Sequence, residues 1–148
     1  MRGKDAINGA EGKCFVTIDG RRLLMANLLK VNVDSKIDKK TFATMGDRVK
    51  KHKSGAMEIT AKATFLYNAP VFRQAIAHYK ETGEELYFEC LIENDDKSSG
   101  AGRQATILKD CNLDGIVIAK LDVDEVGLEE DVEFTADDFD YPEMFKEL

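Results

Sequence analysis

The residues whose spacing most resembles a chemical site are acidic and lie near the C-terminus. Asp122, Asp124, Gly127 and Glu133 match positions 1, 3, 6 and 12 of a calcium-binding EF-hand loop. Position 5 of such a loop supplies an oxygen ligand, but this chain has Val126 there. The flanking sequence is rich in β-branched residues, whereas an EF-hand loop lies between two helices. We therefore expect a loop between strands and no calcium site.

Other segments that could carry chemistry are also incomplete. The glycine-containing segment 98–103 lacks the Lys-Ser/Thr ending of a phosphate-binding loop and leads into a predicted strand. The two histidines, His52 and His78, have no cysteine or histidine neighbour at zinc-ligand spacing. No Gly-x-Ser-x-Gly motif occurs, and the paired carboxylates lie in polar runs. The sequence therefore predicts no catalytic, metal or cofactor site.

The three cysteines, Cys14, Cys90 and Cys111, each lie in a predicted strand. The first residues of the chain contain no apolar segment typical of a secretory signal. Buried, reduced thiols are therefore the favoured interpretation, and a disulfide or a reactive thiol is the alternative.

Size and composition limit the classes of protein further. With 148 residues, of which 43% are hydrophobic, the chain can form one domain with one sizeable core. It has no apolar run approaching the roughly 20 residues needed to span a bilayer, so we expect no membrane partner. The net charge is −7, and the basic cluster 50–53 has no interleaved aromatic residues, so specific nucleic-acid recognition is not expected.

Charge is distributed unevenly along the chain. Between Lys30 and Lys62 basic residues outnumber acidic ones, whereas from Asp122 to the C-terminus only Lys146 opposes a long series of carboxylates. Opposite charges separated in this way can steer self-association between copies. The alternative is two independently solvated surfaces, and charge alone does not decide between them.

The elements that would position these residues are organised around Leu28–Tyr67. Residues 29–34 alternate between apolar and polar, and residues 57–67 alternate more regularly, which is typical of half-buried strands. Between these two arms, Ser35–Ala56 has the composition of a long, basic loop. Loops of this length in a compact domain are usually functional or disordered. We interpret this one as an assembly arm.

The rest of the chain has mainly strand patterns and one helix. The predicted helix has Asn68 or Ala69 near its N-cap, Pro70 in its first turn and Thr82-Gly83 at its end. Further strands are predicted at Cys14–Ile18, Arg21–Ala26, Glu85–Glu93, Arg103–Leu113, Gly115–Val123 and Leu128–Thr135.

About seven strands and one helix, without βαβ alternation, predict a mainly β fold. We expect an antiparallel β-sandwich or partial barrel with one flanking α-helix and a long hairpin loop, in a single domain spanning 1–148. Within it, residues 1–12 are expected to form a flexible arm and residues 136–148 an acidic C-terminal tail.

Three blocks of sequence resemble a known family, in the same order and spacing and over nearly the whole chain. They are Val31–Lys36 with Met45–Arg48 and His52–Gly55; Asp95–Gly102; and Ala119–Asp124 with Leu128–Thr135 and Asp138–Glu143. Together they are similar to phage tail tube proteins of the XkdM type, known from PBSX-like defective prophages and contractile phage-tail-like particles.

This resemblance implies a structural virion or phage-tail-like protein without enzymatic activity or cofactor. Such proteins form hexameric rings that stack into a hollow inner tail tube, a conduit across the host envelope, and each subunit contributes four strands to a shared barrel. The implied partners are other copies of the chain, a tail sheath protein outside, a tape measure protein in the lumen, and baseplate and tail terminator proteins at the ends. DNA would pass through without specific binding, and assembly would take place in the bacterial host cytoplasm.

The resemblance also implies roles by position. The segment Ser35–Gly55 matches the inter-ring stacking loop, with contacts expected from Lys39, Lys40, Met45, Arg48, Lys50, Lys51, His52 and Lys53. The strands on either side match the lumen-forming hairpin, with Val31, Val33, Ile59, Ala61, Ala63 and Phe65. From charge alone, we expect the loop to meet an acidic surface of the next ring, comprising Asp122, Asp124, Glu129, Glu130 and Asp131.

Two alternatives remain at this point. One is a small-ligand β-barrel that holds an apolar or sugar ligand inside the chain's own barrel, although the chain has no tryptophan to line it. The other is a tube subunit of a related secretion or injection machine. The sequence does not distinguish a DNA-carrying particle from a bacteriocin-like one.

Overall fold

The structure is a computed structural model that describes residues 2–67 and 70–147 of the chain. Its elements are the short 3-10 turns η1 (Gly3–Asp5) and η2 (Gly9–Glu11), the helix α1 (Val71–Thr82), and the strands β1 (Gly12–Ile18), β2 (Arg21–Leu24), β3 (Leu28–Phe42), β4 (Lys51–Leu66), β5 (Tyr87–Asp95), β6 (Arg103–Ile116), β7 (Glu129–Ala136) and β8 (Asp138–Glu143). The strands pair antiparallel throughout the described residues. The predicted mainly β fold with one flanking helix is therefore confirmed.

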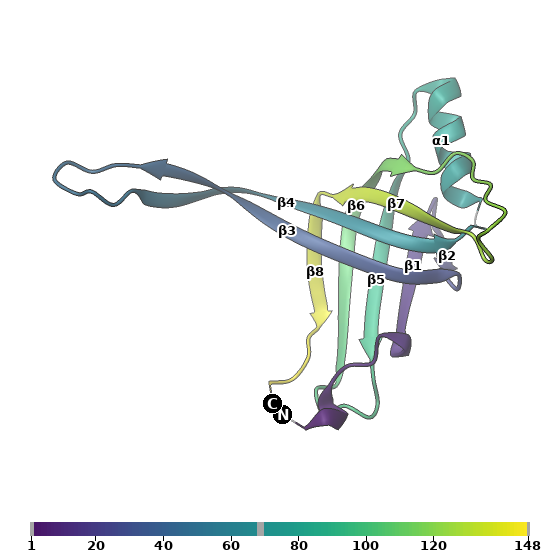
Figure 1. The fold of residues 1–148 in the computed structure, drawn as a ribbon, viewed down its shortest axis with the longest axis horizontal. Coiled ribbons are helices and arrows are strands. Elements are labelled where there is room, and N and C mark those ends of the chain that lie inside the picture. Colours follow the sequence, from purple (N-terminus) through teal and green to yellow (C-terminus); the bar gives the residue numbers. More distant parts are fainter. Residues whose placement is uncertain (1, 68–69, 148) are drawn as a thin grey trace.

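All strands belong to one sheet that folds over itself into two crossing layers (Figure 1). The strand order is β2-β1-β5-β6-β7-β4-β3, and β8 pairs with β6 outside this path. β6 belongs to both layers, because its residues 105–109 pair with β8 and its residues 112–116 pair with β7. Between these two parts Asp110 has a φ of 51°, a local irregularity where the strand changes partner. As described, the sheet is not closed into a barrel.

The space between the layers is filled by apolar side chains from alternate strand positions. A row of phenylalanine rings crosses it: Phe72 lies 5.8 Å from Phe65 and 5.6 Å from Phe88, and Phe88 lies 5.4 Å from Phe134, measured between centroids. Tilted aromatic pairs of this kind contribute about 0.5–1.5 kcal/mol each beyond burial. Because Phe72 belongs to α1, the row anchors the helix to the sheet.

The helix has nearly the boundaries that its sequence predicts. It begins directly after Pro70 and ends at Gly83, whose φ of 76° is favourable for glycine. The Gly83 N–H donates to the carbonyl oxygen of Tyr79 at 2.7 Å, which caps the last turn. The predicted N-cap residues Asn68 and Ala69 lie outside the described residues.

The β3–β4 hairpin is the largest departure from the sequence prediction. Ser35–Ala56 was predicted to be a loop, but strand pairing continues through it to Phe42 and Lys51, so that only residues 43–50 connect the strands. A bulge between Ile37 and Lys39 interrupts the register. Beyond the body of the protein neither face of the hairpin is buried, and the alternation that marks a half-buried strand is therefore absent from its sequence.

Two further predictions are corrected in the C-terminal half. The predicted separate strand Gly115–Val123 does not form, because β6 continues to Ile116 and residues 117–128 then run as a loop to β7. The acidic tail contributes an eighth strand, β8, in which Phe139 packs against the core while carboxylates flank it. A single apolar residue between acidic ones is a weak strand signal, so pairing with β6 decides this element.

The N-terminal segment is held against the body. The Asn8 N–H donates to Asp96 Oδ2 at 2.9 Å, the Ser99 hydroxyl donates to the Asp5 carbonyl at 2.8 Å, and the Gly100 N–H donates to Asp5 Oδ1 at 3.0 Å. The structure therefore gives residues 3–11 two short turns and fixed contacts, where the sequence suggested a free arm.

Candidate assembly interface

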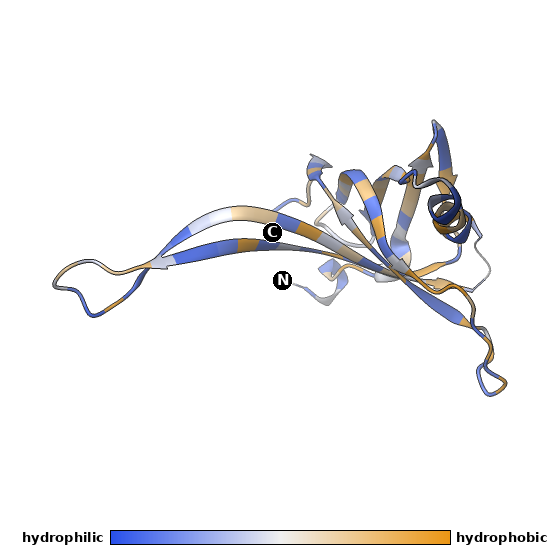
Figure 2. Ribbon diagram, turned by 90° about the horizontal axis from the view of Figure 1, so that it is seen from above, coloured by the Kyte–Doolittle hydropathy of each residue, from blue (hydrophilic) through white to orange (hydrophobic). Residues whose placement is uncertain are grey.

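The projecting part of the β3–β4 hairpin is exposed on both faces. Every residue from 34 to 58 is exposed, and the ribbon extends away from the rest of the protein (Figures 1 and 2). A two-stranded ribbon without a covered face has marginal stability in water. This segment therefore has the character of a structure that is completed by another chain.

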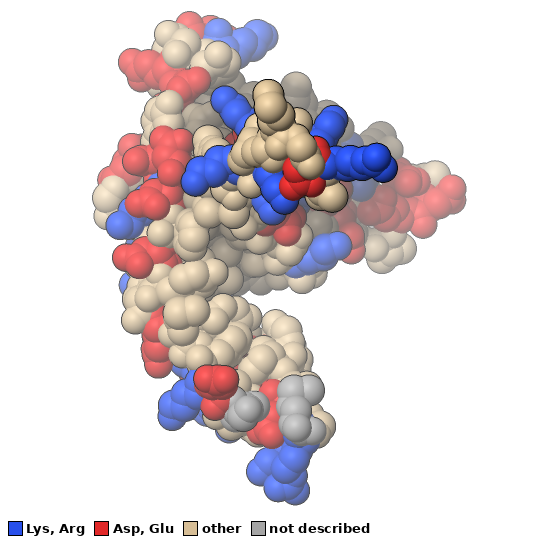
Figure 3. All heavy atoms as spheres, turned by 90° about the vertical axis from the view of Figure 1, so that its left-hand side faces the viewer, with Lys and Arg blue, Asp and Glu red and all other residues tan. Residues whose placement is uncertain are grey.

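The end of this ribbon, residues 39–53, is the basic tip. It holds all the residues expected in the stacking loop, and Lys and Arg side chains surround it in Figure 3. Lys40 pairs directly with Lys53 across the strands. Like charges in that position are destabilising, so an acidic partner surface would relieve them.

The turn at the end of the basic tip is ordered by one carboxylate. Asp47 Oδ1 accepts from the Val49 N–H at 2.9 Å, and its Oδ2 lies 3.0 Å from the Lys51 ammonium. Two hydrogen bonds lower the pKa of the Asp47 carboxyl. The larger effect comes from the Val49 N–H and the smaller from the Lys51 ammonium. Gly46 allows the tight turn with a φ of 84°. Met45 is fully exposed beside it, which gives the tip an apolar contact point among its charges.

The residues expected in the lumen-forming hairpin lie on the core face of β3 and β4. Ile59, Ala61, Ala63 and Phe65 are buried between the two layers, and Val31 and Val33 are partly buried against the same core. They therefore contribute to the subunit core, and Val31, Val33 and Ile59 also line a groove between the layers.

The opposite face of the same strands is polar. Thr60, Lys62 and Thr64 point away from the core. On β7, Glu133 lies opposite Lys62 and Asp131 lies opposite Thr64. The Thr64 hydroxyl donates to Asp131 Oδ1 at 2.8 Å, and the Lys62 ammonium lies 3.8 Å from Glu133 Oε1. Cross-strand pairs of this kind support the sheet without an apolar cover.

The acidic residues expected to form one partner surface occupy different environments. Asp122 and Asp124 lie in the exposed 117–128 loop, Glu129 is exposed at the start of β7, and Asp131 lies on the polar face. Glu130 differs, because it is only 2% exposed and faces the core.

Glu130 is held by an ion pair within the subunit. Its Oε2 accepts from the Arg73 guanidinium of α1. The same guanidinium lies over the ring of Tyr67, 4.5 Å from its centroid. This pair ties the helix to β7, so Glu130 is not available to another subunit and the expectation for it is corrected.

A cluster of exposed aliphatic residues in the 117–128 loop was not predicted from the sequence. Ile118, Leu121, Val123 and Val126 are between 77% and 99% exposed. The pattern of residues 115–123, which include Ile118, Leu121 and Val123, was interpreted as a strand. The same pattern could have marked a segment that pairs with another chain. Among these residues the near-EF-hand spacing forms a turn, in which the Asp124 N–H donates to Asp122 Oδ1 at 3.0 Å.

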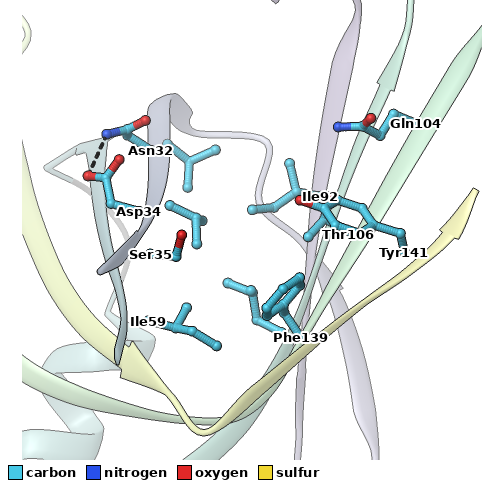
Figure 4. Close-up of a pocket in the computed structure, with 12 residues that line it drawn as sticks. Asn32, Asp34, Ser35, Ile59, Ile92, Gln104, Thr106, Phe139 and Tyr141 are labelled. Carbon is cyan, nitrogen blue, oxygen red and sulfur yellow. Dashed lines mark hydrogen bonds between the residues drawn. The ribbon is translucent and has the colours of Figure 1, made fainter. Parts of the chain in front are cut away.

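A groove of about 250 Å³ lies beneath β3, between the two layers (Figure 4). Ile59, Ile92 and Phe139 point into it, while Asn32 and Asp34 hydrogen-bond to each other at its edge. It is open and below the usual size of a small-molecule pocket, about 300–1,000 Å³. The small-ligand barrel alternative requires a closed barrel interior, and the sheet described here is open.

The cysteines and carboxylates form no evident chemical centre. Cys14, Cys90 and Cys111 are buried thiols without disulfides, and burial raises the pKa of Cys111 to about 12. The Cys14 sulfur, 3.6 Å away, raises the pKa of Cys90 further than burial alone would. In residues 2–67 and 70–147 no group of three or more His, Cys, Asp or Glu could hold a metal ion, and no helix there is long and apolar enough to cross a membrane.

Comparison with known proteins assigns the family. A family model described as phage tail tube protein matches residues 1–143. The chain belongs to the phage tail tube family. Two similar proteins of Bacillus subtilis (strain 168) cover 99% of this tail tube chain and 97% of their own length. They are the uncharacterized protein YqbM, 36% identical over 146 residues, and the phage-like element PBSX protein XkdM, 35% identical over 147 residues.

Solved structures share the tail tube fold at low sequence identity. A chain from the sheath-tube complex of an extracellular contractile injection system, PVC, matches with a TM-score of 0.64 and 10% identity, over 92% of this chain and 90% of that one. A chain from the tail of an empty gene transfer agent particle, refined with C6 symmetry, matches with a TM-score of 0.61 and 10% identity, over 93% and 100%. The tail tube fold described above is therefore shared with tubular assemblies.

Proposed function

We propose that this structural tail tube protein forms hexameric rings that stack into the hollow inner tube of a phage or phage-tail-like particle. Its membership of the phage tail tube family supports the tube, and the likeness to a gene transfer agent tail with C6 symmetry supports the number of copies in each ring. The single observation that carries the proposal is the ribbon 34–58, which is exposed on both faces and needs other subunits to cover it.

The layer that contains the ribbon has the number and order of strands that a tube wall would need from each copy. It comprises β3, β4, β7 and the C-terminal part of β6, which are neighbours in that order. Six copies would place about 24 strands in one barrel, and at a spacing of about 4.8 Å and a tilt of roughly 40° its backbone diameter would be near 48 Å. Side chains would leave a lumen of roughly 30–40 Å, which is wide enough for double-stranded DNA.

The polar face of this layer is the face that we assign to the lumen. The opposite face is already buried in the subunit core, so only the face with Thr60, Lys62, Thr64, Asp131 and Glu133 remains. Mixed charges with an acidic excess repel nucleic acid phosphates and offer no continuous basic track. Such a lumen would let DNA pass without binding it.

The basic tip would form the contact between rings. The tip and the 117–128 loop lie at opposite ends of the longest axis of the subunit (Figure 1), so the tip of one copy can reach the loop of a copy in the next ring. Asp122, Asp124 and Glu129 are the exposed carboxylates available there. Exposed ion pairs contribute only about 0–1 kcal/mol each, so the strength of stacking would come from repetition around the ring.

The remaining partners follow from the place of the tube in a tail. We place a tail sheath protein on the outer layer, which carries α1, and the likeness to a chain of a sheath-tube complex supports this. A tape measure protein would occupy the lumen, and baseplate and tail terminator proteins would bind the two ends. Assembly would take place in the bacterial host cytoplasm before release of the particle.

The test is assembly of the purified full-length protein at high concentration, followed by negative-stain electron microscopy. We expect rings or tubes from the wild type. Replacing Lys39–Ser54 by Asn-Gly, which closes a short hairpin, should leave a folded subunit by circular dichroism but abolish tubes. Intact tubes from this variant would overturn the stacking role, and a wild type that stays monomeric would overturn the tube.

A charge-reversal pair sharpens the same test. Lys50→Glu, Lys51→Glu and Lys53→Glu together should prevent stacking, because the tip would then repel an acidic partner. The matched control, Lys80→Glu with Lys97→Glu and Lys109→Glu, changes net charge equally at exposed body positions and should still form tubes.

A further inference from the structure

The 117–128 loop is ordered by polar contacts while its aliphatic side chains stay in solvent. At its base the Lys120 N–H donates to the Tyr67 hydroxyl at 3.1 Å, and the Lys120 ammonium donates to the Glu129 carbonyl at 2.8 Å and lies 3.3 Å from Glu125 Oε2. The exposed aliphatic residues defined above, including Leu121 and Val123, project from this framework. A fixed loop that presents an apolar surface is typical of an interaction site.

A cleft of matching character lies elsewhere in the subunit. It has a volume of about 770 Å³ and lies between the β1–β2 hairpin and the first residues of β3. Leu24 and Leu29 are about half exposed at its edge, and Met25 is buried within it. Lys13, Lys30 and Glu93 also line this cleft, and Glu93 is already paired with Arg103, whereas Asp122 and Asp124 flank the aliphatic residues of the loop. Apolar surface and charge are therefore complementary.

Both features lie at the open edges of the same layer. β3 is the last strand of the sheet path and pairs only with β4 among the described residues. On the opposite side of the layer, pairing of β6 with β7 ends at Ile116. Unpaired strand edges are templates for addition of another chain.

Strand direction allows these two edges to meet. β6 is antiparallel to β7, β7 to β4, and β4 to β3, so β6 and β3 run in opposite directions. Rotation around a ring preserves direction, and the β6 edge of one copy would therefore lie antiparallel to β3 of the next. Continuing past Ile116, the loop would run toward the start of β3, where the cleft lies.

We infer that the 117–128 loop of one copy docks in this cleft of the neighbouring copy within a ring, an inference that rests on the proposed function. The strand-like sequence 117–123 lacks a strand partner in the isolated subunit and would gain one at the free edge of β3. The contact joins two different surfaces, so it is heterologous and can close a ring. Docking would engage Asp122 and Asp124, so the basic tip of the next ring would meet Glu129, the remaining exposed carboxylate named above.

Site-specific crosslinking in the assembled protein tests this contact. Val123→Cys with Leu29→Cys, treated with a short bismaleimide, should give a ladder of covalent oligomers. The control, Val123→Cys with Met144→Cys, keeps the loop thiol and should give none, because Met144 is exposed and does not line the cleft. The native thiols are buried, but Cys14 also lines the cleft, so Val123→Cys alone, with only the native thiols, measures the background.

A second variant tests the apolar surface. Leu121→Asn with Val123→Asn should lose rings and remain a folded monomer by circular dichroism and gel filtration, whereas Met45→Asn, equally exposed at the basic tip, should keep rings. If the wild type forms rings or tubes while the 123–29 pair does not crosslink and the double variant still assembles, the docking is overturned and the proposed function stands. If the wild type forms neither, the proposed function fails first.

Discussion

The two halves of the β3–β4 hairpin differ in what holds them. In the half within the body, Ile59, Ala61 and Ala63 are buried against β7 and the opposite layer. In the projecting half the same two strands continue their pairing, but every side chain from 34 to 58 is exposed. One half is therefore packed into the core of its own chain, and the other is paired strand to strand without a covered face. Under the proposed function, this extension of the core strands is the assembly surface.

The largest expected change in the free energy of unfolding comes from a substitution in the body. Phe72→Ala removes the ring at the centre of the aromatic row and leaves a cavity between α1 and the sheet. Buried Phe→Ala changes cost about 3–5 kcal/mol. Urea unfolding followed by circular dichroism should show this loss. A free energy of unfolding within 1 kcal/mol of wild type would mean that the row does not anchor the helix.

A matched pair on one strand sharpens the comparison. Ile59 and Met57 are two residues apart on the same face of β4, but their exposures are 8% and 48%. Ile59→Thr should destabilise the subunit by about 2 kcal/mol, because it buries a hydroxyl and removes a methylene.

The same substitution at Met57 should change the free energy of unfolding by less than about 0.5 kcal/mol. Thermal or urea unfolding of the two variants measures both values. Equal losses would show that the projecting half is covered in the isolated subunit.

A smaller loss than that expected for Ile59→Thr concerns pH. The raised pKa of Cys111, about 12 against an ordinary 9.0, means that folding favours the protonated thiol. Its contribution to stability is complete below pH 9 and is lost as pH rises toward 12, with a loss of about 1.4 kcal/mol by pH 10. Unfolding of wild type and Cys111→Ala between pH 8 and 10 should show a steeper decline for wild type. Parallel curves would contradict the burial of this thiol.

The body was predictable because burial leaves a pattern in sequence. The alternation around Ile59 and Ala61 and the glycine at 83 identify a core strand and a helix end without reference to other elements. The projecting strands and the 117–128 loop were not predictable, because their side chains face solvent in the subunit. A segment such as 117–123 has a strand sequence but pairs with no strand in the subunit.

The sequence by itself determined the mainly β class, the position of the helix, the buried thiols and the basic character of the hairpin tip, because each depends on local composition and period. Only the tertiary structure decided that the expected lumen residues are core residues, that Glu130 is buried against Arg73, and that β8 joins β6. Those facts depend on which face of a strand meets the opposite layer. That choice is made by pairing between segments far apart in the chain, which no local pattern records.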